Sequence, residues 1–235
     1  MKNDEIIRLI DFTLLKREKT NEELMKFLFK AEEYQPQAVC IFPEDIRYAK
    51  EILGSSIQIA AVVGGFPKGS SNCEKIYEEI RTAIELGADE IDIVLEPRED
   101  DNYPNEIELE KLVTMREASE GKILKVIIET PLLTERKIRA ITRMSLAVGV
   151  DFVKTCTGKR GECKERDVDI LSYELMRHEL TFKECLGMKI SGGIREKKKL
   201  MRFLELIRTN DSKIIDKKRL RVGSSSLIGN LVTIE

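Results

Sequence analysis

DFVKTCTGK at residues 151–159 and GMKISGGIR at residues 187–195 are the two stretches that indicate the fold of this chain. Each is a short apolar run that carries one lysine, Lys154 or Lys189, and leads into a polar turn with glycine. Short apolar runs bounded by turn residues are typical of strands buried inside a parallel sheet. The two stretches therefore predict two strands of one sheet, each with a lysine near the end where the turn begins.

Runs of the same kind recur along the chain, with helical stretches between them. From the second run onward they lie roughly 20 to 35 residues apart, which is the spacing of βα units. Eight strands that alternate with helices favour an α/β fold with a single (β/α)8 TIM barrel, and the alternative is a doubly wound sheet of seven strands. Because no linker interrupts the sequence, we expect one barrel domain over residues 1–235. The predicted strands are residues 9–14, 38–42, 57–63, 90–95, 124–130, 152–155, 188–191 and 220–224.

Capping boxes predict where two of the helices begin. Thr20 with Glu23 matches the pattern, and so does Ser71 with Glu74. After the second box an isoleucine recurs at every fourth residue, and Gly87 can end that helix.

The composition excludes nucleic acids and membranes as expected partners. The 40 basic and 42 acidic residues give a net charge of −2, so no overall field attracts a polyanion. The chain lacks tryptophan, and aromatic residues make up only 6% of it, which leaves little for stacking on bases. No apolar run approaches the roughly 20 residues that a membrane helix needs.

The cysteines and the single histidine indicate the compartment and the absence of a metal. The five cysteines show no C-x-x-C spacing, which predicts reduced thiols and a cytoplasmic location. The first residues lead into no long apolar segment, so no secretory signal is predicted. With one histidine and no zinc spacing among the cysteines, we expect no metal site.

The barrel prediction also says where the chemistry should lie. Active sites of this fold form at the carboxyl ends of the strands, often with a phosphate bound after strands 7 and 8. Lys154 ends the predicted sixth strand, and Lys189 lies in the seventh. If these strands are neighbours, each ammonium disfavours charge on the other, and a neutral lysine can form a Schiff base. The structural alternative is that each lysine faces solvent or pairs with a carboxylate.

Asp92 and Lys125 are charged residues in two other predicted strands. Strand alternation places Asp92 on one face with Glu90, where a carboxylate near two lysines could move a proton. A structural salt bridge is the alternative role for Asp92. Lys125 lies near the start of its strand, away from the catalytic end, and we expect a structural pairing with a carboxylate such as Glu129 or Glu90.

Glycines, hydroxyls and cations after the last strands are candidates for binding phosphate. Lys159 follows the sixth strand, Arg195 follows the seventh, and residues 223–226 form a Gly-Ser-Ser-Ser turn after the eighth. They offer charge, backbone amides and hydroxyls to an anion. Ordinary loop and helix-cap chemistry is the alternative for each.

These motifs, taken together, resemble the deoxyribose-phosphate aldolase family of class I aldolases, which have the TIM-barrel fold. The matches run in family order through most of the chain, and the order makes them specific where each alone is not. They are DFTLL at 11–15, VCIFP at 39–43, VVGGFPKG at 62–69, GADEID at 87–92, KVIIET at 125–130, the two lysine stretches, and RVGSSS at 221–226.

The resemblance implies a role for each matching residue. Lys154 is similar to the Schiff-base lysine, Lys189 to the second lysine that lowers its pKa, and Asp92 to the proton-transfer aspartate. The positions that cradle the substrate phosphate correspond to Gly158, Lys159, Gly192, Gly193, Gly223, Ser225 and Ser226, to which the charge pattern adds Arg195. The positions that line the substrate cavity correspond to Asp11, Thr13 and Cys40.

The implied reaction is the reversible cleavage of 2-deoxy-D-ribose 5-phosphate into acetaldehyde and D-glyceraldehyde 3-phosphate, with no metal or organic cofactor. Four residues depart from the family pattern: Phe12, Glu96, Pro131 and Cys156 stand where His, Asn, Gly and Ser are common. Two alternatives remain, a Schiff-base aldolase for another phosphosugar and a barrel that binds a phosphosugar without turning it over. The sequence leaves a homo-oligomer open.

Overall fold

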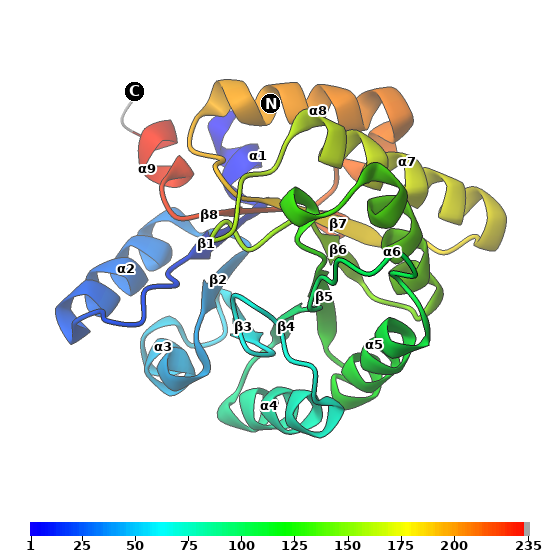
Figure 1. Cartoon of the computed structure of the whole chain (residues 1–235). Helices are drawn as coiled ribbons and strands as arrows, with labels where there is room; N and C mark the ends of the chain where they lie inside the picture. The colour runs from blue at the N-terminus through cyan, green and yellow to red at the C-terminus, as the bar shows by residue number, and fades with distance from the viewer. Residues whose placement is uncertain (233–235) are drawn as a thin grey trace.

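Eight parallel strands close into a barrel in sequence order, with β8 pairing to β1 (Figure 1). The computed structural model describes residues 1–232, so the last three residues of the expected domain lie outside the described residues. The barrel confirms the predicted fold class, and the seven-strand alternative is wrong. The strands are β1 (Ile10–Thr13), β2 (Ala38–Ile41), β3 (Gln58–Val63), β4 (Glu90–Val94), β5 (Ile123–Ile127), β6 (Phe152–Lys154), β7 (Gly187–Ser191) and β8 (Leu220–Ser224).

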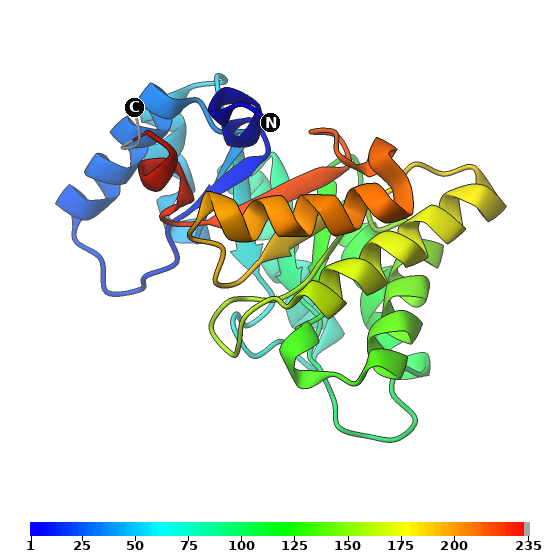
Figure 2. The same cartoon turned by 90° about the horizontal axis from the view of Figure 1, so that it is seen from above.

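Helices surround the barrel, and Figure 2 shows α7 and α8 side by side along one flank. The two ends of the described chain meet where the Asn3 side chain donates a 2.9 Å hydrogen bond to the Leu231 carbonyl. The α-helices are α1 (Asn3–Ile7), α2 (Asn21–Tyr34), α3 (Ile46–Leu53), α4 (Cys73–Leu86), α5 (Glu106–Ala118), α6 (Glu135–Ala147), α7 (Glu165–Phe182), α8 (Lys197–Asp211) and α9 (Leu227–Val232), and the 3-10 turns are η1 (Pro43–Asp45), η2 (Thr130–Leu132) and η3 (Ser212–Ile214). Within residues 1–232, none of these helices is long and apolar enough to cross a membrane.

One predicted helix start is confirmed and the other is wrong by one residue. At α2, the Thr20 hydroxyl accepts from the Glu23 amide at 3.2 Å, and the Glu23 carboxylate accepts from the Thr20 amide at 2.8 Å. At α4 the cap is Asn72, whose side-chain oxygen accepts from the Lys75 amide at 2.9 Å. Asparagine and serine are equally good N-cap residues, and Asn72 is the one that directly precedes the helix. The predicted end of α4 at Gly87 is confirmed, with φ at 110°.

Side chains alternate between an apolar outer layer and a partly charged barrel interior. On β4, Ile91 and Ile93 belong to the large core between strands and helices, whereas Val94 belongs to a small cluster with Cys40 and Val62. Inside the barrel the remaining space is filled by paired charges. Burying charges is expensive and seldom adds stability, so this interior indicates a function.

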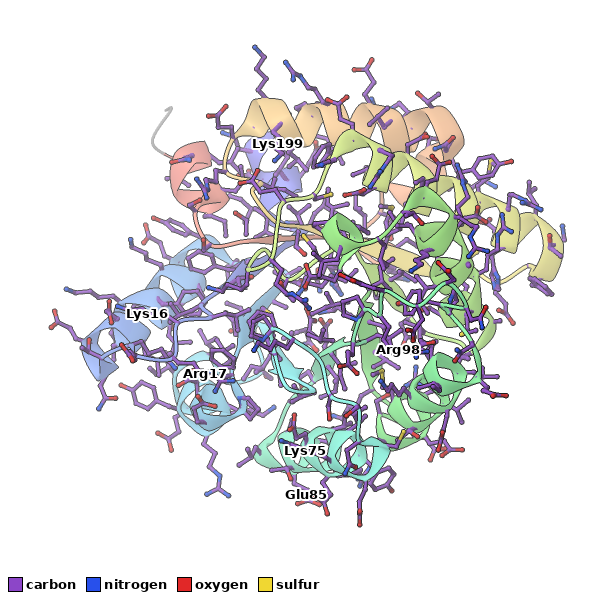
Figure 3. All side chains as sticks on the ribbon, viewed as in Figure 1. Lys16, Arg17, Lys75, Glu85, Arg98 and Lys199 are labelled. Carbon is purple, nitrogen blue, oxygen red and sulfur yellow. The ribbon has the colours of Figure 1, made fainter. Side chains whose placement is uncertain are left out.

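Side chains at the rim of the barrel hold the loops that follow the strands. Arg17 lies over the ring of Phe42, 4.6 Å from its centroid, beside the end of β2. Arg98 donates to Glu108 at 2.7 Å and ties the loop after β4 to α5 (Figure 3). These contacts frame the end of the barrel at which the strands finish.

Candidate active site

Seven charged side chains from six strands meet inside the barrel, each at most 3% exposed. Strand register brings them together, because Lys154 lies opposite Lys189, Asp92 opposite Lys125, and Lys189 opposite Arg221. The predicted neighbourhood of the two lysines is therefore confirmed. The cluster consists of Asp11, Glu90, Asp92, Lys125, Lys154, Lys189 and Arg221.

Asp92 is the centre of this cluster. Its Oδ2 atom lies 2.7 Å from Lys154 Nζ and 2.7 Å from Lys189 Nζ, and its Oδ1 atom lies 3.0 Å from Lys125 Nζ. Burial alone raises the pKa of Asp92, but the three lysines outweigh it and hold that pKa well below its usual range. Asp92 is therefore a carboxylate in the resting site, in contact with both candidate catalytic lysines.

Lys189 is held as an ammonium by two carboxylates. Its Nζ lies 2.6 Å from Asp11 Oδ2 as well as 2.7 Å from Asp92. Burial lowers the pKa of Lys189, but Asp11 and Asp92 raise it above its usual range. Lys189 therefore carries its charge next to Lys154, which contacts the same Asp92 oxygen.

Lys125 belongs to the same cluster, which the sequence did not indicate. Its Nζ lies 2.8 Å from Asp11 and also contacts Glu90 and Asp92. The predicted pairing with Glu90 is confirmed, whereas the alternative partner Glu129 is wrong, because the Glu129 carboxyl bonds elsewhere. Burial lowers the pKa of Lys125, and the three carboxylates raise it well above its usual range. The contact depends on the register of β4 against β5, which places Lys125 opposite Asp92.

Lys154 differs from the rest of the cluster in reaching a cavity. It is 3% exposed, and of the seven clustered side chains it alone lines the opening at the ends of β6, β7 and β8. The cluster holds three lysines, one arginine and three carboxylates. Lys154 is the side chain of this cluster that a molecule in the cavity can reach.

The cavity is about 170 Å³ in volume, and all the candidate phosphate residues line it. They come from the end of β8 and from the loops after β6, β7 and β8, which is the end of the barrel expected from the sequence. The other lining residues include Thr13, Thr157 and Ser191. The candidates are Gly158, Lys159, Gly192, Gly193, Arg195, Gly223, Ser225 and Ser226.

Two of these glycines combine a left-handed backbone angle with a close neighbour. Gly192 and Gly193 have φ of 99° and 71°. A Cβ atom at Gly192 would come 2.4 Å from Cys156 Sγ, and one at Gly193 would come 2.2 Å from the Glu162 carboxyl group. Gly192 is therefore required by both space and backbone angle, whereas Gly193 is favoured by its backbone angle, because the exposed Glu162 side chain can move.

The three candidates for the substrate cavity lie at different depths. Thr13 lines the cavity, and its hydroxyl donates to the Asp11 carbonyl at 2.8 Å. Asp11 and Cys40 are fully buried and lie outside the residues that line it. The Cys40 thiol lies 3.8 Å from Asp92 Oδ2, and burial raises its pKa. Asp11 contacts Lys125 and Lys189, and Cys40 contacts Asp92, so both residues touch the charged cluster without lining the cavity.

The departures from the family pattern fit their surroundings. Cys156 is buried, and its thiol donates to the Ser191 carbonyl at 2.8 Å. Phe12 stacks on Phe27 with ring centroids 4.4 Å apart. Glu96 accepts from Lys111 at 3.0 Å. None of these side chains enters the cavity.

The described residues 1–232 contain no group of three or more His, Cys, Asp or Glu side chains that could hold a metal ion. The chemistry open to the site is that of an amine nucleophile, a neighbouring ammonium, a carboxylate and a pocket for an anion.

Known proteins match this chain over most of its length. The family model for DeoC/LacD family aldolase matches residues 6–210. The deoxyribose-phosphate aldolase of Clostridium botulinum strain Langeland is 40% identical over 205 residues, which cover 84% of this chain and 91% of that protein. The deoxyribose-phosphate aldolase of Metamycoplasma hominis is 36% identical over 192 residues, covering 81% and 85%.

Solved structures share the fold. The aldolase QR15 is 26% identical with a TM-score of 0.79, and the match covers 97% of this chain and 95% of that one. The tetrameric deoxyribose phosphate aldolase from Aeropyrum pernix is 24% identical with a TM-score of 0.77, covering 99% and 92%.

Proposed function

The chain belongs to the DeoC/LacD family of aldolases, and from this we propose that it reversibly cleaves 2-deoxy-D-ribose 5-phosphate into acetaldehyde and D-glyceraldehyde 3-phosphate. The reaction is that of a class I aldolase, with a lysine Schiff base as the intermediate. The observation that carries the proposal is the contact of Lys154 and Lys189 with the same Asp92 oxygen, at the floor of a cavity lined by glycines and cations.

Lys154 is the nucleophile in this mechanism, because it is the clustered lysine that lines the cavity. Its neutral amine attacks the C1 aldehyde of the open-chain sugar, and loss of water gives a protonated imine. The imine accepts the electron pair of the C2–C3 bond when that bond breaks. Glyceraldehyde 3-phosphate leaves, the remaining enamine takes a proton at C2, and water releases acetaldehyde from Lys154.

Asp92 and Lys189 serve the proton transfers. The C3 hydroxyl must lose its proton as the C2–C3 bond breaks, and the enamine must gain one. Asp92 is 2.7 Å from both lysine nitrogens, which supports a path between the substrate and Lys154 through Asp92, Lys189 and a bound water. Charge on Lys189 also favours the neutral form of Lys154 at the start of each cycle.

The substrate phosphate binds among the loops after β6, β7 and β8. Backbone amides of the glycine turns, the Ser225 and Ser226 hydroxyls, and the cations Lys159 and Arg195 supply the donors. The partner is thus a small phosphosugar. Five free thiols are consistent with a cytoplasmic location, and a homo-oligomer is tested by measuring the molar mass in solution.

Borohydride trapping tests the imine and its site together. Incubation with 2-deoxyribose 5-phosphate and borohydride should leave an adduct on Lys154 in peptide mass mapping, and Lys154→Met should abolish both the adduct and the cleavage. The Lys111→Met variant is the control, because Lys111 is a buried lysine outside both the charged cluster and the cavity, and it should keep the adduct on Lys154.

Each other outcome changes the proposal in a definite way. An adduct on Lys189 would exchange the roles of the two lysines. An adduct only with a different phosphosugar would favour an aldolase of other substrate preference. A folded protein that binds inorganic phosphate but forms no adduct with any of a panel of phosphosugars would favour a binding barrel.

A further inference from the structure

Glu129 takes no part in the steps above, yet its backbone and side chain are both under constraint. It follows β5 in the left-handed conformation, with φ at 55° and ψ at 57°. Two other non-glycine residues in the described chain have positive φ, Gln35 and Lys183, and both are exposed helix ends. Glu129 is fully buried. Such backbone strain in a buried non-glycine residue persists where the surrounding structure requires that residue.

The Glu129 carboxyl group is also placed at a cost in stability. Its Oε1 atom accepts a 3.2 Å hydrogen bond from the Thr157 backbone amide. Its Oε2 atom is buried with no hydrogen-bond partner among the described residues. Burial raises the pKa of Glu129, and hydrogen bonding from Thr157 offsets part of that rise. Strain, burial and an oxygen without a hydrogen-bond partner each cost stability, so their combination at Glu129 points to a role other than stability.

Thr157, whose amide donates to Glu129, begins the part of the loop after β6 that lines the cavity. Thr157, Gly158 and Lys159 all line the cavity, and the Thr157 hydroxyl accepts from the Lys159 amide at 3.1 Å. Gly158 is left-handed, with φ at 70°, and a Cβ atom there would come 3.2 Å from Gly192 Cα. The loop after β6 is thus fixed on one side by glycine contact with the loop after β7, and on the other by Glu129.

Backbone hydrogen bonds bring Glu129 to this position. The Ile128 amide donates to the Lys154 carbonyl at 3.0 Å, and the Thr130 amide donates to the Thr155 carbonyl at 2.8 Å. Glu129 lies between Ile128 and Thr130, and its left-handed backbone brings its side chain to the Thr157 amide at the start of the loop after β6.

We propose that Glu129 is a positioning residue, which ties residues 157–159 to the end of β5 and thereby sets the affinity of the site for the substrate phosphate. This inference rests on the proposed function for its substrate. The acceptor oxygen, rather than the charge of the carboxyl group, performs the task, because a single neutral acceptor is enough for the Thr157 amide.

Two substitutions separate the side chain from the backbone. Glu129→Gln keeps an acceptor of the same shape without the charge. Glu129→Gly removes the acceptor but suits the left-handed backbone, so the turn itself is retained. Glu117→Gln, on the exposed side of α5, is the matched control.

The measurements are kcat and KM for 2-deoxyribose 5-phosphate and for unphosphorylated 2-deoxyribose. A second readout is the rise in Tm that inorganic phosphate produces, which needs no turnover. For Glu129→Gln we expect a KM within about threefold of the wild type. For Glu129→Gly we expect a KM for the phosphosugar about tenfold higher or more, because the amide loses its bond and the loop its position. Turnover of unphosphorylated sugar should change little, and the Tm rise with phosphate should shrink.

Three results would overturn the inference. A wild-type KM in Glu129→Gly would show that only the turn matters. Equal losses in the Gln and Gly variants would assign the effect to charge. Equal losses with both sugars would assign it to Lys154 rather than to phosphate. If the wild-type protein does not cleave 2-deoxyribose 5-phosphate, the proposed function fails, and the Tm rise with phosphate still tests Glu129.

Discussion

At Asp92, one carboxylate contacts three lysines, and this sharing determines what each lysine can do. Lys125 and Lys189 also contact the Asp11 carboxylate, whereas among residues 1–232 Lys154 has Asp92 alone within ion-pair distance. The lysine with the fewest partners is also the one that lines the cavity. A buried ammonium keeps its proton in proportion to the carboxylates around it. The arrangement therefore holds Lys125 and Lys189 as ammonium groups, and it leaves Lys154 with fewer carboxylate contacts at the edge of the cavity.

Cys156 offers a test of how far a departure from the family pattern matters. Its thiol donates to the Ser191 carbonyl, which also accepts from the Thr155 hydroxyl at 3.0 Å. A serine hydroxyl can make the same bond, so Cys156→Ser should change the free energy of unfolding by no more than about 1 kcal/mol. Its kcat should stay close to that of the wild type.

Urea unfolding and steady-state kinetics check this expectation, with Cys156→Ala as the variant that loses the donor. A Cys156→Ser variant with a tenfold change in kcat would contradict it. Such a change would mean that the thiol itself, behind the glycine turn after β7, takes part in catalysis.

Among the secondary-structure elements, local sequence patterns predicted the eight strands of the barrel but misplaced the N-cap of α4. Each predicted strand contains most of the observed one, because apolar runs between polar helices are visible along the chain itself. The start of α4 was placed at Ser71 although Asn72 makes the cap. Two adjacent residues of good capping chemistry look alike in sequence, and only the backbone decides between them.

The α4 cap gives a prediction with its own control. Asn72→Ala should lower the free energy of unfolding by about 1 kcal/mol, because the Lys75 amide loses its acceptor. Ser71→Ala should lower it by far less. Thermal and urea unfolding of the two variants check the difference. Equal losses, or a larger loss for Ser71→Ala, would mean that the helix begins one residue earlier in solution.

The residues of the candidate site were predictable where a lysine or a glycine turn marks the end of a strand. They were less predictable where a contact depends on which residues of two strands lie opposite each other. Lys154, Lys189 and Asp92 stand in apolar runs that the sequence displays, and each was named from it. Lys125 looked peripheral, and its contact with Asp92 depends on the register of β4 against β5. Glu129 was considered only as a partner for Lys125. Its backbone angle is a property of the turn after β5, which no local pattern indicates.

For the molecule as a whole, the barrel interior contains buried charges that serve the proposed reaction and add little to the stability of the fold. Four cations face three carboxylates within the cluster, and all are buried. Removing a carboxylate from such a cluster leaves cations without compensation, whereas removing the surplus cation restores the balance. Loss of the carboxylate should therefore destabilise the protein, whereas loss of the surplus cation should not.

Lys154→Met and Asp92→Asn make this comparison. Lys154→Met replaces the surplus amine by an apolar chain of similar length, and we expect an unchanged or higher free energy of unfolding, by up to about 1 kcal/mol. Asp92→Asn leaves three lysines around a neutral amide, and we expect a free energy of unfolding lower by about 3 kcal/mol or more, with kcat lower by at least about a hundredfold.

Urea unfolding at neutral pH measures the stability of both variants, and Glu117→Gln on the surface of α5 should match the wild type. A loss of about 2 kcal/mol or more in Lys154→Met would mean that Lys154 is a needed partner of Asp92 in the resting protein, and that the neutral, nucleophilic amine forms only when substrate enters the cavity.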